Sequence, residues 1–156
     1  MVLPRAAWAL GSIILAGSQL AAQGVYAGAG VGPTFVPGEY PAGRNWFGML
    51  AYQSPRGLGF RLSASETVHR IWGSADVTYR FGTIGHTVRP YVLAGAGTVV
   101  DFSERDPLVT AGAGLRIRLT QVLSVFGELR AHAALGLAGR EPDTIVPVTI
   151  GTAVGH

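Results

Sequence analysis

The sequence contains neither cysteine nor lysine, and only 13% of its 156 residues are charged. The absence of cysteine excludes disulfide bonds, thiolate metal sites and a lipid anchor on an N-terminal cysteine. A charged share of about half the usual value leaves few charges for the surface of a water-soluble domain. The net charge of +3 is too small to indicate nucleic-acid binding, and we expect no nucleic-acid partner.

Long apolar runs are also scarce, and the one exception lies at the N-terminus. Met1–Arg5 carries one positive charge, Ala6–Gly17 is uncharged and mostly apolar, and Ser18–Gln23 is small and polar. This layout predicts a secretory signal peptide, and the alternative of a membrane-spanning helix would need about 20 apolar residues. We therefore divide the chain into a signal peptide, 1–23, and a single domain, 24–156.

Beyond residue 23 the dominant sequence period is two, which is typical of strands with one apolar and one polar face. In IWGSADVTYRF (Ile71–Phe81), the apolar set includes Val77 and Tyr79, whereas the intervening positions include Asp76 and Arg80. Segments of this kind are about ten residues long, the length of a tilted strand that crosses a bilayer. The eight expected strands are Gly24–Val36, Asn45–Gln53, Leu58–Thr67, Ile71–Phe81, Arg89–Val100, Leu108–Leu119, Val122–Leu135 and Thr144–Gly155.

The connections between these segments are expected to alternate in length. Three longer ones hold much of the acidic charge, namely Pro37–Arg44, Asp101–Pro107 and Gly136–Asp143. Short turns are expected between them. The link Val68–Arg70 is an exception to the alternation, because it is short where a longer connection would be expected. Alternating connections of this kind are typical of up-and-down barrels with two unlike ends.

The aromatic residues are expected to lie near the strand ends in two girdles, as in a barrel surrounded by lipid. One girdle would contain Tyr26, Tyr52, Phe60, Tyr79, Phe81, Tyr91 and Phe126. The other would contain Phe35, Trp46, Phe47, Trp72 and Phe102.

Strands that cross a lipid bilayer are expected to close into a barrel. In hydrocarbon every backbone N–H and C=O must be paired internally, so strands can span a membrane only as a closed barrel. Eight strands make a small closed wall whose interior side chains can fill. The sequence therefore predicts an all-β fold, an eight-stranded antiparallel up-and-down transmembrane β-barrel, with small and polar residues inside and apolar residues outside.

Four segments carry a resemblance to a known family: RPYVLAGAG (Arg89–Gly97), TAGAGLRIRL (Thr110–Leu119), SVFGELRAHA (Ser124–Ala133) and the terminal TIGTAVGH. With the signal peptide, they resemble the small eight-stranded outer-membrane β-barrel family, which includes the transmembrane domain of outer membrane protein A. The resemblance implies a place in the outer membrane of a Gram-negative cell envelope, contact with outer-membrane lipids, and help from the barrel insertion machinery.

Two residues near the C-terminus depart from the family pattern. The last residue of the family is typically Phe, whereas this chain ends in His156. Pro147 withholds a hydrogen-bond donor from a strand that must pair on both sides, and we expect a bulge there.

The charges within the strands fall on the inward face of the expected barrel. The predicted lumen network consists of Arg61, Asp76, Arg80, Arg116, Arg118, Glu128 and Arg130. Buried charges are tolerated when they are paired and hydrogen-bonded. Cross-strand reach in the two hairpins predicts the pairs Arg61–Asp76 and Arg116–Glu128. Either the network plugs the lumen or, because arginines outnumber acids, it lines a narrow anion-leaning pore.

Catalytic and metal motifs are weak in this sequence. Ser124 and His132 share a strand face with Glu128 but would lie some 27 Å apart, at about 3.4 Å per residue, which is too far for a triad. His69 and Glu66 near the outer rim, with the neighbouring Ser63 and Ser65, remain the candidates for catalysis.

No pair of histidines or carboxylates has metal-ligand spacing, and we expect no catalytic or cofactor site. The glycine-rich GAGVG and AGAG stretches lack the following helix and lysine of a phosphate loop.

These observations favour a small, monomeric, non-catalytic outer-membrane barrel with a structural, barrier or surface-contact role. Three alternatives stay open: the anion-leaning pore, a soluble secreted ligand-binding barrel, and an outer-membrane lipid-modifying enzyme or protease. A soluble barrel would need apolar inward faces and polar outward faces. An outer-membrane barrel and a soluble barrel can therefore be distinguished by the direction of four side chains, those of Arg116, Arg118, Glu128 and Arg130.

Overall fold

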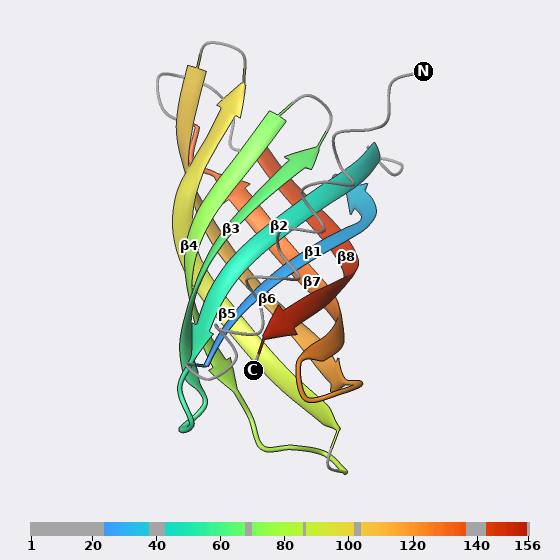
Figure 1. The fold of residues 1–156 in the computed structure, drawn as a ribbon. Helices are drawn as coiled ribbons and strands as arrows, with labels where there is room; N and C mark the ends of the chain where they lie inside the picture. The colour runs from blue at the N-terminus through green and yellow to red at the C-terminus, as the bar shows by residue number, and fades with distance from the viewer. Residues whose placement is uncertain are drawn as a thin grey trace, which may run out of the picture.

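The computed structural model describes residues 24–37, 43–67, 70–85, 87–101, 104–136 and 143–155. Within them the chain forms eight antiparallel strands that close into a single barrel in sequence order (Figure 1). The strands are β1 (Val25–Phe35), β2 (Gly43–Gln53), β3 (Leu58–Thr67), β4 (Arg70–Arg80), β5 (Val88–Asp101), β6 (Glu104–Arg118), β7 (Leu123–Ala134) and β8 (Asp143–Gly155). The predicted fold class and strand number are confirmed.

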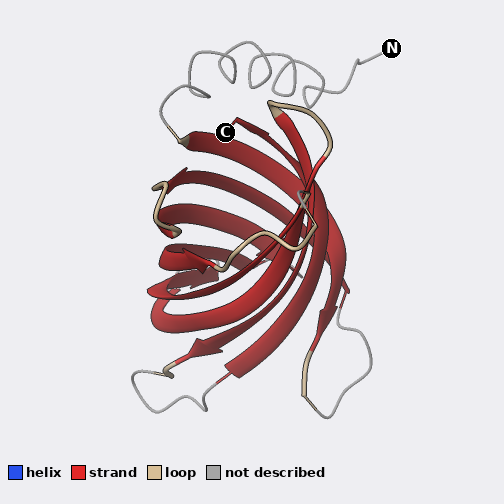
Figure 2. Ribbon diagram, turned by 90° about the horizontal axis from the view of Figure 1, so that it is seen from below, coloured by secondary structure: helices blue, strands red, loops and turns tan. Residues whose placement is uncertain are grey.

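The wall closes between the first and last strands, where Tyr26 pairs with Gly155. Both ends of the described chain therefore lie at one end of the barrel, which we call the terminal end; it is the lower end in Figure 1. The opposite end, where β1, β3, β5 and β7 finish, is called the loop end. Figure 2 shows that the described residues form strands and connecting loops. No helix in this part of the chain is long and apolar enough to cross a membrane.

Period two sorts the side chains as expected. On β3 the exposed and buried positions alternate without a break from Leu58 to Thr67. Leu62, Val77 and Leu129 face outward with about half of each side chain exposed. Arg61 and Asp76, which directly precede Leu62 and Val77, point inward and are buried. The outer wall is thus apolar and the interior polar, the reverse of a water-soluble barrel.

One predicted connection is wrong. The segment Asp101–Pro107 is mostly strand, because β5 continues to Asp101, β6 begins at Glu104, and these two residues pair with each other. Its charges do not break the alternation, since Val99 and Leu108 are both buried inside the barrel. With 14 and 15 residues, β5 and β6 are longer than a bilayer crossing requires. Connection lengths consequently alternate less than the sequence suggested.

The expected bulge at Pro147 is also wrong. Pairing between β1 and β8 stops after Val31↔Ile150 and resumes at Thr34↔Pro147 in the same register. Pairing with β7 likewise stops after Leu129↔Val148 and resumes at His132↔Ile145. The proline interrupts the ladder without inserting a residue. The terminal His156 lies outside the described residues.

The aromatic residues divide between the two faces. The predicted girdles are confirmed in part, because the outward aromatics are Phe35 and Trp46 at the loop end and Tyr52, Phe60, Tyr79 and Phe81 at the terminal end. Tyr26, Phe47, Trp72 and Phe126 lie inside the barrel instead, because an interior of this width must be filled by large side chains. Phe102 lies outside the described residues.

Candidate functional site

Four charged side chains meet inside the barrel near mid-height. Arg61 comes from β3, Asp76 from β4, and both Glu128 and Arg130 from β7. All four are inward positions of alternating strands, and between 0% and 4% of each residue is exposed. Taking a charge out of water is costly unless hydrogen bonds and an opposite charge replace the water. Their partners therefore decide what this site can do.

Glu128 is the centre of the cluster. Its carboxylate accepts hydrogen bonds from both terminal nitrogens of Arg61, at 2.6 and 3.3 Å. It also accepts from Nε and Nη2 of Arg130, at 2.9 and 2.7 Å, and from the hydroxyl of Tyr91 at 2.7 Å. Arg61 spans the lumen to reach it, because β3 and β7 are not neighbours in the sheet. One carboxylate thus joins three strands across the interior.

Asp76 forms the second acidic centre. Its Oδ2 lies 3.4 Å from Nε of Arg61 and 3.6 Å from Nη1 of Arg130. The hydroxyls of Ser63 and Ser74 donate to the same oxygen at 3.3 and 3.2 Å. The predicted Arg61–Asp76 pair is therefore present, and the two residues are directly opposite in the β3–β4 register.

Space for Asp76 comes from a glycine on the next strand. A Cβ atom at Gly95 of β5 would lie only 2.6 Å from Oδ1 of Asp76, so a larger residue there would displace the carboxylate. Oδ1 is buried and has no hydrogen-bond partner among the described residues. The AGAG repeat in β5 therefore has a packing role at this position.

The predicted Arg116–Glu128 contact is wrong, although the register is the expected one. Arg116 of β6 is directly opposite Phe126, so Glu128 and Ser124 are its two diagonal neighbours on β7. Arg116 extends toward the terminal end, where its Nε donates to Ser124 Oγ at 2.7 Å and its guanidinium lies 3.9 Å from the centre of the Tyr26 ring. Glu128 is already surrounded by two other arginines.

The remaining members of the predicted network lie apart from this cluster. Arg80 and Arg118 occupy inward positions at the terminal ends of β4 and β6 and are partly exposed. The structure thus brings together Arg61, Asp76, Glu128 and Arg130, and places Arg80, Arg116 and Arg118 in a separate group nearer the rim.

Aromatic rings complete the middle of the lumen. The Phe47 ring lies beneath both guanidinium groups, 5.0 Å from Arg130 and 5.8 Å from Arg61, and meets Phe126 edge-on at 6.0 Å. Cation–π contacts of this kind are favourable for a desolvated arginine. Phe47 and Tyr91 were expected in the aromatic girdles but lie inside the barrel, because the sequence pattern does not record the partner across the lumen.

An apolar layer closes the interior toward the loop end. The rings of Trp72 and His132 lie 5.5 Å apart at a tilt of 49°, and Trp72 packs with buried Val99, Leu108 and Ile145. Trp72 Nε1 and His132 Nδ1 have no hydrogen-bond partner in the described part of the chain. The lumen therefore changes from arginine-rich at the terminal end, through paired charges, to a loop end where this apolar cluster lies beside the hydrogen-bonded Asn45 and Thr67.

The catalytic candidates within the described residues do not come together in one site. Ser63 and Ser65 are buried inside the barrel, whereas Glu66 faces outward, because consecutive strand residues point to opposite faces. Ser63 is engaged with Arg130 and Ser74. His69 lies outside the described residues.

The set on β7 also stays separate. Ser124 bonds with Arg116 and His132 packs on Trp72, so neither contacts Glu128. No group of three potential metal ligands occurs among the described residues.

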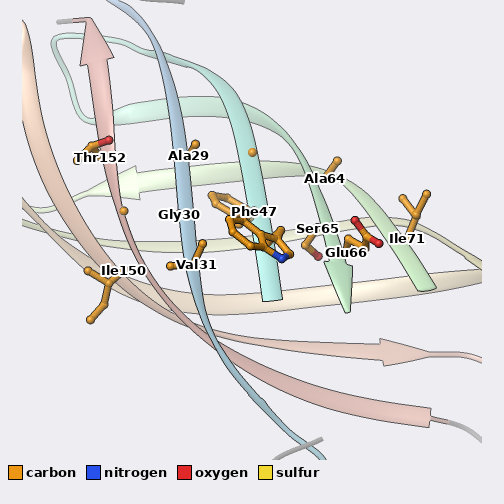
Figure 3. Close-up of a pocket in the computed structure, with 13 residues that line it drawn as sticks. Ala29, Gly30, Val31, Phe47, Ala64, Ser65, Glu66, Ile71, Ile150 and Thr152 are labelled. Atoms are coloured by element: carbon orange, nitrogen blue, oxygen red, sulfur yellow. The ribbon is translucent and has the colours of Figure 1, made fainter. Parts of the chain in front are cut away.

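A shallow recess lies on the outer wall toward the loop end (Figure 3). Its volume is about 570 Å³ and its lining is mostly apolar, with Ala29, Ala64, Ile71 and Ile150 around it. Glu66 contributes the one charged side chain of this lining. The recess follows small residues on the outward face of neighbouring strands.

Comparison with known proteins shows likeness in structure alone. The N-terminal β-barrel domain of Pseudomonas aeruginosa OprF superposes with a TM-score of 0.61 at 21% identity, covering 84% of this chain and 98% of that one. Neisserial surface protein A (NspA) gives 0.67 at 13%, covering 85% and 97%. The outer membrane enzyme PagL gives 0.54 at 17%, covering 84% and 99%.

No family model and no curated protein matches the sequence. The structures it resembles are small eight-stranded outer-membrane β-barrels, and this chain has their fold.

Proposed function

We propose that the protein is a small integral outer-membrane barrel with a structural, barrier or surface-contact role, whose lumen is plugged by its own side chains. The distribution of side chains about the wall carries this proposal. Paired charges are buried inside, while aliphatic groups such as Leu129 and Ile150 cover the outside with 54% and 65% exposed. Such a wall is stable when hydrocarbon surrounds it.

The same distribution argues against a soluble ligand-carrying barrel. That class places apolar side chains inside and charged ones outside. Here Arg116, Arg118, Glu128 and Arg130 all occupy inward positions. In water the exposed outer wall would be a large apolar surface, which soluble monomers avoid.

Location and partners follow as parts of the proposal. Residues 1–23 act as a cleavable signal peptide, and residues 24–156 form the barrel domain in the bacterial outer membrane. The barrel works as a monomer in contact with outer-membrane lipids, after assembly by the barrel insertion machinery. The apolar outer recess supports the lipid contact, because acyl chains match its lining.

Charge balance supports a plug over an open pore. At mid-height the two arginines, Arg61 and Arg130, are matched by two carboxylates, Asp76 and Glu128. Charged side chains that are balanced and bonded to one another offer a passing ion little to replace its water. We propose no catalytic role: the fold is shared with an enzyme, PagL, but the candidate Ser63 and Glu66 point to opposite faces.

Conductance across planar lipid bilayers tests the plug. We expect the folded wild-type protein to give no steady current at neutral pH. Arg61→Ala removes the side chain that spans the lumen, and we expect it to produce discrete current steps. Arg44→Ala, an exposed arginine at the loop end of β2, is the matched control and should stay silent. A steady anion-selective current in the wild type would favour the pore instead.

A further inference from the structure

The two ends of the barrel differ in charge. Among the described residues, every Asp and Glu other than Asp76 and Glu128 belongs to a strand end at the loop end. These residues are Glu66, Asp101, Glu104, Asp106 and Asp143. The loop end also carries Arg44, Arg70 and Arg105, so its charge is mixed. The terminal end carries arginines in strands and in the β2–β3 turn, and the described residues include no acid there. They are Arg56, Arg80, Arg89, Arg116 and Arg118.

Four of these arginines point into the mouth of the lumen. Arg89 of β5 and Arg116 of β6 are directly opposite each other in the register. Arg118 is the next inward residue of β6, and Arg80 ends the neighbouring strand β4. The positive charges of Arg80 and Arg118 act on both Arg89 and Arg116. Like charges directly opposite in a sheet are destabilising, so this arrangement needs an explanation.

Arg89 and Arg116 retain hydrogen-bond donors that the described part of the barrel does not satisfy. Nε of Arg89 is buried and has no hydrogen-bond partner among the described residues. Arg116 contacts Ser124 and the Tyr26 ring, neither of which brings a negative charge. Buried polar atoms in native proteins usually have a partner, and a missing one indicates a ligand, ion or water.

A recess of about 10 Å³, with room for about one water-sized atom, opens beside these side chains. Its lining includes Arg89, Arg116 and Arg118, together with the polar side chains of Gln121 and Ser124. Planar guanidinium forks bind oxyanions through pairs of parallel hydrogen bonds, which gives both strength and geometric selectivity. The recess therefore has room for one oxygen atom beside donors of two adjacent strands, and the other oxygens of a larger group would lie in the open mouth of the lumen.

We propose that the terminal mouth of the lumen is a binding site for a phosphate group, held between Arg89 and Arg116 with Arg80 and Arg118 supplying further positive charge. A phosphate there accepts from Arg89 and Arg116 and replaces their mutual repulsion by two attractions. The phosphate comes from a free anion or from an anionic lipid headgroup at the rim. This inference requires only the barrel wall and its charge distribution, so it stands whether or not the middle of the lumen conducts ions.

Calorimetric titration with inorganic phosphate tests the site. The protein is held in a non-ionic detergent, and sodium chloride keeps the ionic strength constant, because screening weakens non-specific attraction. We expect saturable binding of one phosphate per barrel to the wild type. Arg89→Gln and Arg116→Gln should each weaken it by at least about tenfold, because each removes charge-assisted hydrogen bonds.

Arg56→Gln is the matched control. Arg56 lies at the same end of the barrel and its loss changes the net charge equally, but it is exposed in the β2–β3 turn outside the lumen. This variant should bind phosphate as the wild type does. Absence of saturable binding in the wild type, or an equal loss in Arg56→Gln, would overturn the proposal.

Two further arms complete the test. If Arg89→Gln does not reach the folded, heat-modifiable form, Arg89→Lys keeps the charge but not the fork, and should weaken binding several-fold; unchanged affinity in that variant would count against the site. Adding phosphatidylglycerol to the detergent micelles separates the two sources. Competition with phosphate identifies a lipid headgroup as the ligand, and unaltered phosphate binding identifies the free anion.

Discussion

The Glu128 carboxylate holds two arginines and a tyrosine in the middle of the barrel. Its removal would leave Arg61 and Arg130 facing each other, with Asp76 as their remaining counter-charge. An uncompensated buried charge is among the largest single penalties a substitution can cause. The stability of the wall is therefore tied to this residue more than its position on one strand suggests.

We predict that Glu128→Ala lowers the free energy of unfolding by about 3–5 kcal/mol. Urea unfolding of the protein in lipid vesicles, followed by tryptophan fluorescence, measures this change. Glu66→Ala is the matched control, because Glu66 is an exposed, outward-facing carboxylate, and its effect should stay within about 0.5 kcal/mol. Equal unfolding midpoints for Glu128→Ala and the wild type would show that the network does not stabilise the barrel.

The face on which each charged side chain lies could be predicted from the sequence, whereas its contact partner often could not. The pair Arg61–Asp76 was predictable because both residues lie in one tight hairpin whose turn sets the register. The pair Arg61–Glu128 was not, because β3 and β7 meet only through the closed lumen, and no local pattern records that distance. Arg116 reached the diagonal Ser124 instead, because Arg61 and Arg130 already surround Glu128.

Among the strands, β8 is the least regularly paired. Its ladders to β1 and β7 are interrupted on both sides of Pro147, and Pro33 lies in the gap on β1. A proline has no backbone N–H, and backbone groups without a ladder partner open more easily. By contrast, β5 and β6 pair without interruption from Val88↔Ile117 to Asp101↔Glu104.

We predict that the backbone amides of Val146, Val148 and Thr149 exchange with solvent deuterium at least about tenfold faster than amides in the middle of β5 and β6. Hydrogen exchange followed by NMR in detergent micelles measures both sets in one sample. The comparison is internal, because both segments lie at similar heights in the wall. Uniform protection along β8 and β5 would mean that the interrupted pairing does not weaken this strand.

Strand number and order could be predicted because alternation and turn signals repeat along the chain. The start of β6 could not, because DFSERDP has the composition of a loop although its buried neighbours Val99 and Leu108 continue the inward set. The expected bulge at Pro147 failed for a similar reason. A strand can accommodate the backbone N–H that proline lacks by leaving a few residues unpaired, without the extra residue of a bulge.

The whole molecule is organised along its axis as well as across its wall. Arginines gather at the terminal end, paired charges occupy the middle, and the apolar cluster of Trp72, Leu108 and Ile145 lies toward the loop end. Across the wall, the direction of each side chain follows from period two. The proposed place in the outer membrane requires that the outward side chains face lipid.

Spin labelling on β7 tests that claim most directly. The chain has no cysteine, so Val125→Cys, Leu129→Cys and Ala133→Cys each give a single outward label, and Thr120→Cys gives a label in the β6–β7 turn. In lipid vesicles we predict that access to oxygen, relative to a water-soluble nickel chelate, is highest at Leu129 and falls toward Val125 and Ala133. At Thr120 we predict the opposite, greater access of the nickel chelate than of oxygen. Greater access of the nickel chelate than of oxygen at Leu129 would contradict the account, because the outer wall would then face water.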